Sequence, residues 1–370
     1  MNIQRYMTRG VVRVVTDSLR ATAKNERESA FMRSFAEASR AASKKRYAAE
    51  RNGEHIPPFL IASITSACNL HCAGCYSRSN NACCDAKPVD QLSAEEWDRI
   101  FREAEELGIS FIMLAGGEPL IRRDVIEAAG AMPDIIFPIF TNGTFIDERY
   151  FQLLDRCRNL VPVMSIEGGK EITDARRGSG IYDLVTKNMA KCKEKGLIFG
   201  ASITVTTENA AEVSSRDYVR KLAEQGCKLV IYVEFVPVTE EARHLAPGER
   251  ERALMAQAID ALRADYDDMV LLSFPGDELA MGGCMAAGRE FFHINSHGGA
   301  EPCPFSPYSD SNVKTSSLKE AIRSRLFEQL REQHVLEEEH VGGCVLFSQK
   351  SQVERIMAEI AASRTAELKA

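Results

Sequence analysis

Three cysteines stand close together in this chain, with the spacing C-x3-C-x2-C: Cys68, Cys72 and Cys75. Neither helix nor strand periodicity places all three thiols on one face, but a short loop can turn them toward one metal centre. A four-iron four-sulfur cluster has four irons to ligate, so three local cysteines leave one iron open. The spacing therefore predicts a cluster with a free position for chemistry.

Zinc binding, disulfide formation and simple burial are the alternative roles for these thiols. A structural zinc site usually has four ligands, and His71 completes the set only if the loop folds back sharply. A structural disulfide would pair two of the three thiols and strand the third, and nothing in the chain indicates secretion. An iron-sulfur cluster fits the spacing best, and zinc is the alternative to test.

A second group of residues with chemical potential follows the next expected strand, in the run Ala115-Gly116-Gly117-Glu118-Pro119. The two glycines let the backbone approach a neighbour closely, and the carboxylate of Glu118 can accept a hydrogen bond from an ammonium group. Taken alone, Gly-Gly and Glu-Pro predict no more than a chain reversal.

Taken together, the cysteine spacing and the GGEP run one βα unit later resemble the radical S-adenosylmethionine (SAM) superfamily. The resemblance covers roughly Pro58 to Pro237. It implies that the three cysteines hold a 4Fe-4S cluster whose open iron binds the amino and carboxylate groups of SAM. It also implies that Gly116, Gly117 and Glu118 contact SAM. The position before the third cysteine is usually aromatic in the superfamily; here it is Gly74, and the aromatic Tyr76 on the far side becomes a candidate for shielding the adenine.

The loop after the fourth expected strand, Ser165-Ile166-Glu167-Gly168, resembles a Ser-Ile-Asp-Gly pattern of the peptide- and cofactor-modifying branches. By that match Ser165 and Glu167 are candidates for the SAM ribose or methionine carboxylate, and Arg177 can pair with a carboxylate bidentately. The alternative is a tight βα turn with solvated charges.

Three further cysteines, Cys284, Cys303 and Cys344, stand beside glycines and prolines in the last quarter of the chain. The pattern Cys284-x13-Gly298-x4-Cys303 resembles the C-terminal twitch and SPASM extensions, which implies a second, auxiliary iron-sulfur cluster, expected to be 4Fe-4S. His340, a distant cysteine or substrate are the candidates for its fourth ligand. Burial in an ordinary core is the alternative role, because free cysteine is often buried.

Alternating strand-like and helix-like runs after Pro57-Pro58 predict repeated βα units. This rhythm indicates the α/β class, and the resemblance implies a partial (β/α)6 TIM-like barrel with loops after the strands forming one functional rim. The expected strands are Phe59 to Thr65, Ser110 to Leu114, Ile135 to Phe140, Leu160 to Ile166, Phe199 to Val205 and Leu229 to Phe235. The expected helices are Ala94 to Leu107, Asp124 to Ala131, Asp147 to Arg156, Tyr182 to Lys195 and Ser214 to Gln225.

Three parts of the chain are expected. Residues 1–57 form a basic helical extension, residues 58–240 the barrel, and residues 241–370 a helical linker and a small α+β extension that holds the auxiliary cluster. The first part carries 12 Arg or Lys against 6 Asp or Glu, a charge of +6, while the whole chain has −7. Its amphipathic run from Ile3 to Arg20 is expected to pack on its own barrel, with peripheral membrane contact as the second choice.

Composition narrows the compartment and partners. The chain has 370 residues, 45% of them apolar, which is enough for a large core. With eleven cysteines but no signal-peptide pattern, it is expected in a reducing cytoplasm. No apolar run approaches the roughly 20 residues that span a bilayer. The net negative charge disfavours nucleic acid as a partner.

The function predicted from these features is reductive cleavage of SAM to a 5′-deoxyadenosyl radical, which takes a hydrogen atom from a substrate. The auxiliary cluster favours an oxidative outcome, and a reductant such as flavodoxin or ferredoxin is implied. Peptides, cofactor precursors and lipids all remain open as substrates. The competing hypothesis is an iron-sulfur electron carrier or redox sensor without radical chemistry.

Overall fold

The computed structural model describes residues 3–85, 88–281, 283–337 and 343–367. Its centre is a nine-stranded sheet with the strand order β7-β6-β5-β4-β3-β2-β1-β8-β9. All pairings from β7 to β8 are parallel, and only β9 is antiparallel to its neighbour. The strands are β1 (Phe59–Thr65), β2 (Phe111–Gly116), β3 (Phe137–Thr141), β4 (Leu160–Ser165), β5 (Gly200–Val205), β6 (Leu229–Glu234), β7 (Val270–Phe274), β8 (Phe291–Ile294) and β9 (Ala300–Glu301).

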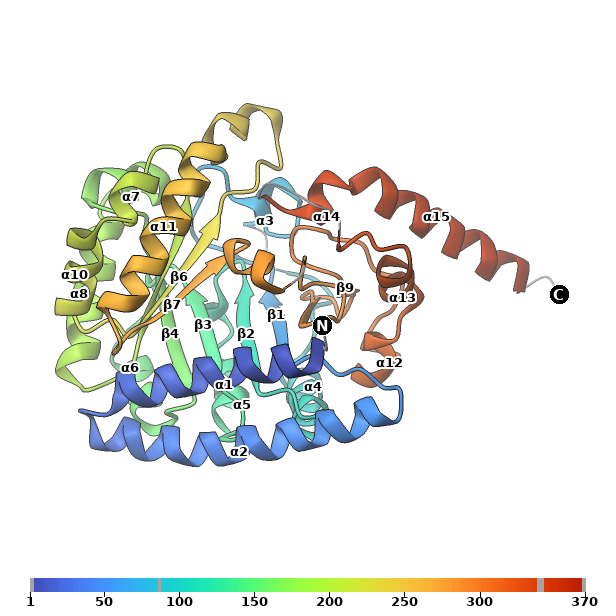
Figure 1. Ribbon diagram of the computed structural model, residues 1–370, viewed down its shortest axis with the longest axis horizontal. Coiled ribbons are helices and arrows are strands. Elements are labelled where there is room, and N and C mark those ends of the chain that lie inside the picture. Colours follow the sequence, from blue (N-terminus) through green and yellow to red (C-terminus); the bar gives the residue numbers. More distant parts are fainter. Residues whose placement is uncertain (1–2, 86–87, 282, 338–342, 368–370) are drawn as a thin grey trace.

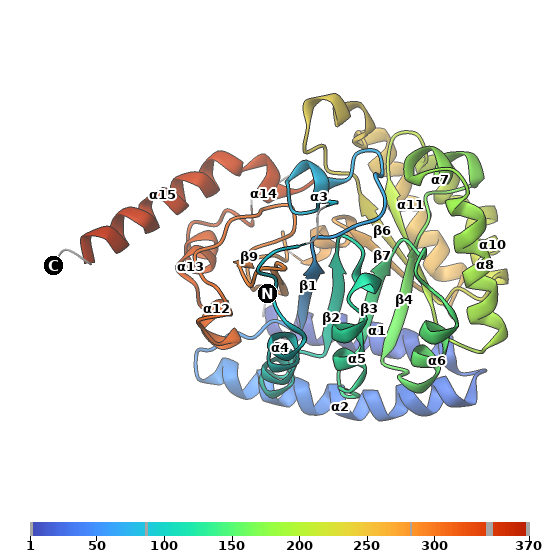
Figure 2. The same cartoon turned by 180° about the vertical axis from the view of Figure 1, so that it is seen from behind.

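Helices follow the strands and cover the outer face of the sheet, which confirms the α/β class (Figure 2). Within β1, Leu60, Ala62 and Ile64 are fully buried, whereas the residues between them are partly exposed, as the two-residue period of a strand requires. Helices of the barrel region are α3 (Tyr76–Ser79), α4 (Ala94–Leu107), α5 (Arg123–Gly130), α6 (Glu148–Arg156), α7 (Lys170–Arg177), α8 (Ile181–Glu194), α9 (Ala210–Val213) and α10 (Arg216–Glu224), with a 3-10 turn η1 (Pro119–Ile121).

Helix α4 has the expected bounds because local sequence signals mark both its start and its end. Ser93 and Glu96 form a capping box at its start, and Gly108 adopts φ +87° at its end. Inside the fold, the ring of Phe101 in α4 lies 5.1 Å from that of Phe137 in β3, centroid to centroid. The helix thus packs its apolar side onto the sheet.

The six expected strands correspond to β1–β6, with ends shifted by up to two residues, and the structure adds three strands beyond these six. Strand β7 pairs with β6, and β8 pairs with β1, so residues after 240 extend the barrel sheet at both sides. The rings of Phe274 at the end of β7 and Phe291 at the start of β8 contact each other, with centroids 5.7 Å apart. This aromatic contact bridges strands that are not hydrogen-bonded, so the sheet curls into a barrel with a side-chain seam.

The N-terminal helices α1 (Ile3–Thr22) and α2 (Glu26–Arg51) run across the end of the barrel where the strands begin (Figure 1). Val15, Met32 and Phe35 form a small core with strand-start residues such as Phe111 and Val161. The expected packing of this extension on its own barrel is therefore found. In the described part of the chain, no helix is long and apolar enough to cross a membrane.

The remaining elements lie beyond β6 and around β8. They are η2 (Glu240–Leu245), α11 (Glu249–Asp265), η3 (Gly276–Met281), α12 (Leu318–Ile322), α13 (Arg325–Glu332), α14 (Val345–Ser348) and α15 (Lys350–Glu367). Helices α12–α15 gather beside β9, and α15 extends away from the barrel toward the C-terminus (Figure 1). Cys344 caps the start of α14 and lies beside residues at the ends of β6 and β7.

Candidate functional site

The cysteine loop follows β1 at the carboxyl end of the sheet, and Cys75 caps the short helix α3. Arg78 of that helix holds the loop in shape. Its Nη2 donates hydrogen bonds to the carbonyl of Leu70 at 2.7 Å and to that of Cys68 at 3.3 Å. The loop is therefore tied to a cationic side chain, which favours thiolates nearby.

The three thiols are half-buried, and the loop turns between the last two, where the amide of Cys75 donates to the carbonyl of Cys72 at 3.2 Å. A hydrogen bond from the thiol of Cys83 lowers the pKa of Cys68 to about 6, although burial opposes the shift. Burial raises the pKa of Cys72, and the guanidinium of Arg177, with its Nη1 4.0 Å from the Cys72 sulfur, opposes that increase. Three adjacent thiols beside two arginines suit an iron-sulfur cluster, whose ligands are thiolates.

Gly116 and Gly117 bring β2 against the start of the cysteine loop. The amide of Gly117 donates to the carbonyl of Thr65, and the amide of Glu118 donates to that of Ala67, both at 2.8 Å. A Cβ at Gly117 would lie 2.1 Å from the Ala67 oxygen, which no side chain tolerates. These glycines are thus required for the close backbone approach that places the loop.

The carboxylate of Glu118 is buried and joins the loops after β2 and β3. One oxygen accepts from the hydroxyl of Thr141 at 2.7 Å and from the amide of Leu120 at 3.0 Å, and the other accepts from the amide of Asn142 at 2.8 Å. Burial raises the pKa of Glu118 to about 7, because these hydrogen bonds offset only part of the desolvation.

The loop after β3 also holds the cysteine loop directly. The side-chain amide of Asn142 donates to that of Asn69 at 3.0 Å, and Asn69 donates to the hydroxyl of Thr144 at 2.9 Å. Asn69 lies between the first two cysteines of the motif. The polar residues of three consecutive βα loops therefore form one hydrogen-bonded rim.

Glu167 is fully buried and binds two arginines of α7. Its Oε1 accepts from Arg176 Nη1 at 2.5 Å and from Arg177 Nε at 2.7 Å, and its Oε2 accepts from the amide of Thr204 at 2.8 Å. Burial raises the pKa of Glu167, but the two guanidinium groups outweigh this and the net pKa is lowered. The backbone carbonyl of Arg176 also accepts from the amide of Ala73 at 2.8 Å, so α7 is fastened to the cysteine loop.

Ser165, the other candidate of this loop, ends β4 opposite Ser202 of β5. It is half-buried at the same rim as Glu167.

Gly74 and Tyr76 show how this loop differs from the usual pattern. Gly74 has φ +65°, and a Cβ there would lie 2.5 Å from the ring of Phe235, which follows β6 and is buried. Phe235 thus fills the space beside Gly74. The ring of Tyr76 packs against Phe305 with centroids 4.7 Å apart. Tyr76 therefore contacts the C-terminal cysteine region instead of lying free at the rim.

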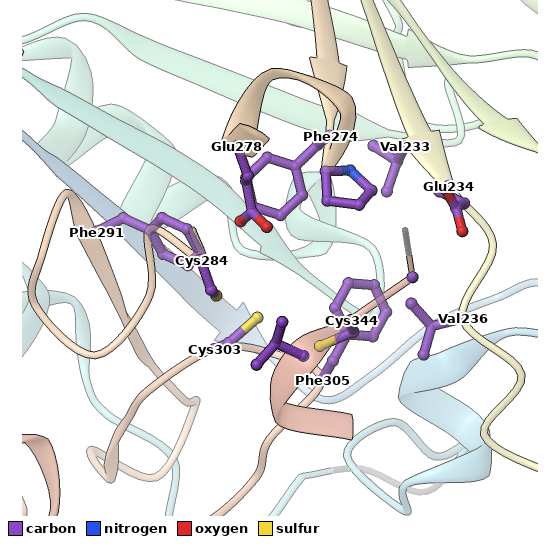
Figure 3. A pocket seen from close by; sticks show the side chains of 13 residues that line it. Val233, Glu234, Val236, Phe274, Glu278, Cys284, Phe291, Cys303, Phe305 and Cys344 are labelled. Carbon is purple, nitrogen blue, oxygen red and sulfur yellow. The ribbon is translucent and has the colours of Figure 1, made fainter. Parts of the chain in front are cut away.

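Cys284, Cys303 and Cys344 line one small cavity at the seam of the barrel (Figure 3). The ends of β6 and β7, the start of β8 and the loop after β9 form its walls, with Val233, Glu234, Val236, Phe274, Pro275, Glu278, Phe291, Phe305, Gly343 and Val345 as the other lining residues. The neighbouring thiol of Cys344 and burial together raise the pKa of Cys303 well above its usual value. His340, the predicted fourth ligand, lies outside the described residues.

Among the residues that the structure describes, no three His, Cys, Asp or Glu side chains converge tightly enough to hold a single metal ion. A four-iron cluster binds each protein ligand through a different iron, so its ligands surround a volume and need not meet at one point. The three C-terminal thiols surround one cavity from different segments of the chain, which suits the arrangement of a cluster.

The structure brings together two sets of cysteines and also shows partners that the sequence did not single out. Asn69, Arg176, Phe235, Glu278 and Phe305 contact or lie beside the predicted residues. The only local signal for Arg176 is its place beside Arg177, and Glu278 has only its position six residues before Cys284. Phe235 and Phe305 carried no signal, because their roles depend on contacts with Gly74 and Tyr76, which lie far away in the sequence.

The comparisons with known proteins agree with one another on a family. A family model described as the Radical SAM superfamily matches residues 62–231. A probable GTP 3′,8-cyclase of Methanococcus maripaludis is 30% identical over 226 residues, which cover 57% of this chain and 70% of that protein. An Fe-coproporphyrin III synthase of Methanosarcina barkeri is 28% identical over 159 residues, which cover 42% of this chain but only 39% of that protein.

A solved structure has the same fold. The crystal structure of Streptococcus suis SuiB bound to precursor peptide SuiA superimposes with a TM-score of 0.63 at 18% identity, and covers 78% of this chain and 70% of that one.

Proposed function

Because this chain belongs to the radical SAM superfamily, we propose that Cys68, Cys72 and Cys75 hold the SAM-binding 4Fe-4S cluster and that Cys284, Cys303 and Cys344 hold an auxiliary cluster. The observation that supports this most is the contact between Tyr76 and Phe305, which joins the loops of the two thiol sets. When bound, the first cluster supplies the electron that cleaves SAM to methionine and a 5′-deoxyadenosyl radical, which takes a hydrogen atom from the substrate.

The chain's own residues then have to position SAM and exclude water. Gly116 and Gly117 let the backbone of β2 lie directly against the start of the cysteine loop, where a side chain at either position would clash with the backbone there. Glu118 and Glu167 act mainly by holding the loops around the cluster, because both carboxylates already accept hydrogen bonds from the protein. Ser165, Arg177 and Tyr76 remain candidates for direct contacts with SAM. The Nη1 atom of Arg177 lies 4.0 Å from the sulfur of Cys72.

The substrate is proposed to bind inside the barrel, between the two thiol sets. The auxiliary cluster at the seam would take the electron that an oxidised substrate loses, which makes a dehydrogenation, cross-link or decarboxylation the expected outcome. A peptide is one candidate substrate, since the similar fold of SuiB was solved with a precursor peptide. Tetrapyrrole-type or other cofactor precursors are the second, because an Fe-coproporphyrin III synthase is among the relatives.

The test is anaerobic reconstitution with iron and sulfide, reduction by dithionite in the presence of SAM, and detection of 5′-deoxyadenosine. Wild type should form it without substrate. Cys72→Ala should abolish it, whereas Cys344→Ala should retain it, and Cys157→Ala, at the end of α6, is the matched thiol control that should behave as wild type.

Three outcomes would contradict the proposal. Zinc without sulfide would support a zinc-stabilised module, and clusters without 5′-deoxyadenosine would support an electron carrier. Equal loss of cleavage in folded Cys72→Ala and Cys344→Ala protein would rule out separate roles for the two thiol sets.

A further inference from the structure

A fourth side chain with ligand chemistry lines the cavity of the C-terminal cysteines. Glu278 belongs to η3, which follows β7, and only 2% of it is exposed. Figure 3 shows its carboxyl group directed toward the side of the cavity where the sulfurs of Cys284 and Cys303 lie. It enters the cavity from a different element than any of the three cysteines, so the four side chains surround the space.

These four side chains lie in two neighbouring pairs, Cys284 with Glu278 and Cys303 with Cys344. The amide of Met285 also donates to Glu278 Oε1 at 3.3 Å, so the carboxylate is held beside Cys284 by the backbone of the cysteine segment itself. Four groups that can each bind iron once deprotonated therefore stand around one cavity.

We propose that Glu278 is the fourth protein ligand of the auxiliary cluster, an inference that rests on the proposed function of the three C-terminal cysteines. A four-iron cluster has one iron for each of the four groups. With Glu278 bound, no iron of this cluster is open to substrate. The auxiliary cluster then accepts or passes electrons and does not anchor the substrate.

A second carboxylate lines the same cavity and provides a comparison. Glu234 ends β6, and its Oε1 accepts from Arg252 Nη2 at 2.7 Å and from Arg252 Nε at 3.0 Å. Figure 3 places Glu234 at the other end of the cavity, away from Cys284 and Cys303. Its charge is compensated by an arginine on α11, so it is the carboxylate less suited to bind iron.

The experiment isolates the auxiliary cluster in a full-length background in which Cys68, Cys72 and Cys75 are all replaced by alanine. After reconstitution, iron and sulfide are counted, and the reduced protein is examined by electron paramagnetic resonance before and after addition of cyanide, which binds an open iron. In the background protein the spectrum should not change with cyanide. Adding Glu278→Ala should make it change, and Glu278→Cys should restore the insensitive spectrum.

Glu234→Gln is the matched control, and it should leave both the spectrum and its insensitivity to cyanide as in the background. Loss of iron in Glu278→Ala with retention in Glu278→Cys would also support the inference, since a thiolate then replaces the carboxylate. A background spectrum that shifts with cyanide and is unaltered by Glu278→Ala would overturn it. If the background protein takes up no iron, the hypothesis of an auxiliary cluster is refuted, and with it the role of Glu278. The role of the first thiol set is tested separately, by the formation of 5′-deoxyadenosine in the wild-type protein.

Discussion

The aromatic rings of Tyr76 and Phe305 lie with their centroids 4.7 Å apart and their planes at 55°. Tyr76 directly follows Cys75, and Phe305 lies two residues after Cys303, so one ring pair connects the two cysteine regions across 229 positions of the chain. Phe305 also lines the cavity that Cys284, Cys303 and Cys344 surround. The contact therefore makes the geometry of one thiol set sensitive to that of the other.

This pair should show a measurable energetic coupling. Tyr76→Ala and Phe305→Ala each remove packing, and the double variant should be about 1 kcal/mol more stable than the sum of the single losses predicts. Urea unfolding of the four proteins gives the coupling. Tyr308→Phe, which removes only a hydroxyl bonded to the exposed Glu354, should leave the unfolding midpoint nearly unchanged. Strictly additive losses would mean that the two rings do not support each other.

The close fit of Gly74 against Phe235 should affect how much iron and sulfide the first thiol set binds. Gly74→Ala adds a Cβ 2.5 Å from the Phe235 ring and also strains a backbone with φ +65°, so the iron and sulfide bound by the first thiol set should fall. Combining it with Phe235→Ala should recover part of the loading, because the clash is relieved and the strain is not. Gly53→Ala is the control for strain alone, since Gly53 has φ +76° and nothing within 4 Å. Equal losses in Gly74→Ala and Gly53→Ala would show that the clash is unimportant.

Glu167 is expected to be important for stability. Glu167→Gln leaves the guanidinium groups of Arg176 and Arg177 buried without their carboxylate, which should cost about 3 kcal/mol in the free energy of unfolding. The comparison is Asp183→Asn, which breaks the exposed ion pair with Lys170 and should change little. Urea midpoints measure both, and similar effects of the two substitutions would contradict the expectation.

Glu290 should make stability depend on pH. Burial raises the pKa of Glu290 from 4.5 to about 8, and the charges of Arg289 and Arg46 offset only part of this. Below the ordinary pKa both folded and unfolded chains hold the proton. Between pH 4.5 and about 8 the unfolded chain has released the proton and the folded chain still holds it, so stability falls as the pH rises, by at most about 1.4 kcal/mol per pH unit, and the fall ends once the folded chain also releases the proton above pH 8.

Glu290→Gln should flatten that slope between pH 5.5 and 8, measured as urea midpoints against pH relative to wild type. Glu54→Gln is the control, because hydrogen bonds from Lys319 and Arg323 lower the pKa of Glu54 and place its titration below this window. A Glu290→Gln protein with the wild-type slope would show that another group is responsible.

Much of the barrel and both sets of candidate cysteines could be predicted from local sequence. The bounds of α4 match because capping residues and apolar period act within a few positions of the helix itself. Strands β1–β6 were found because each is a short apolar run between turn signals, and the clustered thiols were found because C-x3-C-x2-C is read within eight residues.

The tertiary structure alone decided how the barrel closes and what surrounds the cysteines. Strand β7 pairs with β6, and β8 pairs with β1, which lies more than 200 residues earlier in the chain. A strand's hydrogen-bonding groups do not specify such a distant partner. Their positions create the seam at Phe274 and Phe291, and the cavity at that seam brings Glu278 beside Cys284. Sequence therefore determined the positions and spacing of the candidate thiols, whereas long-range strand pairing decided which side chains lie around the second set.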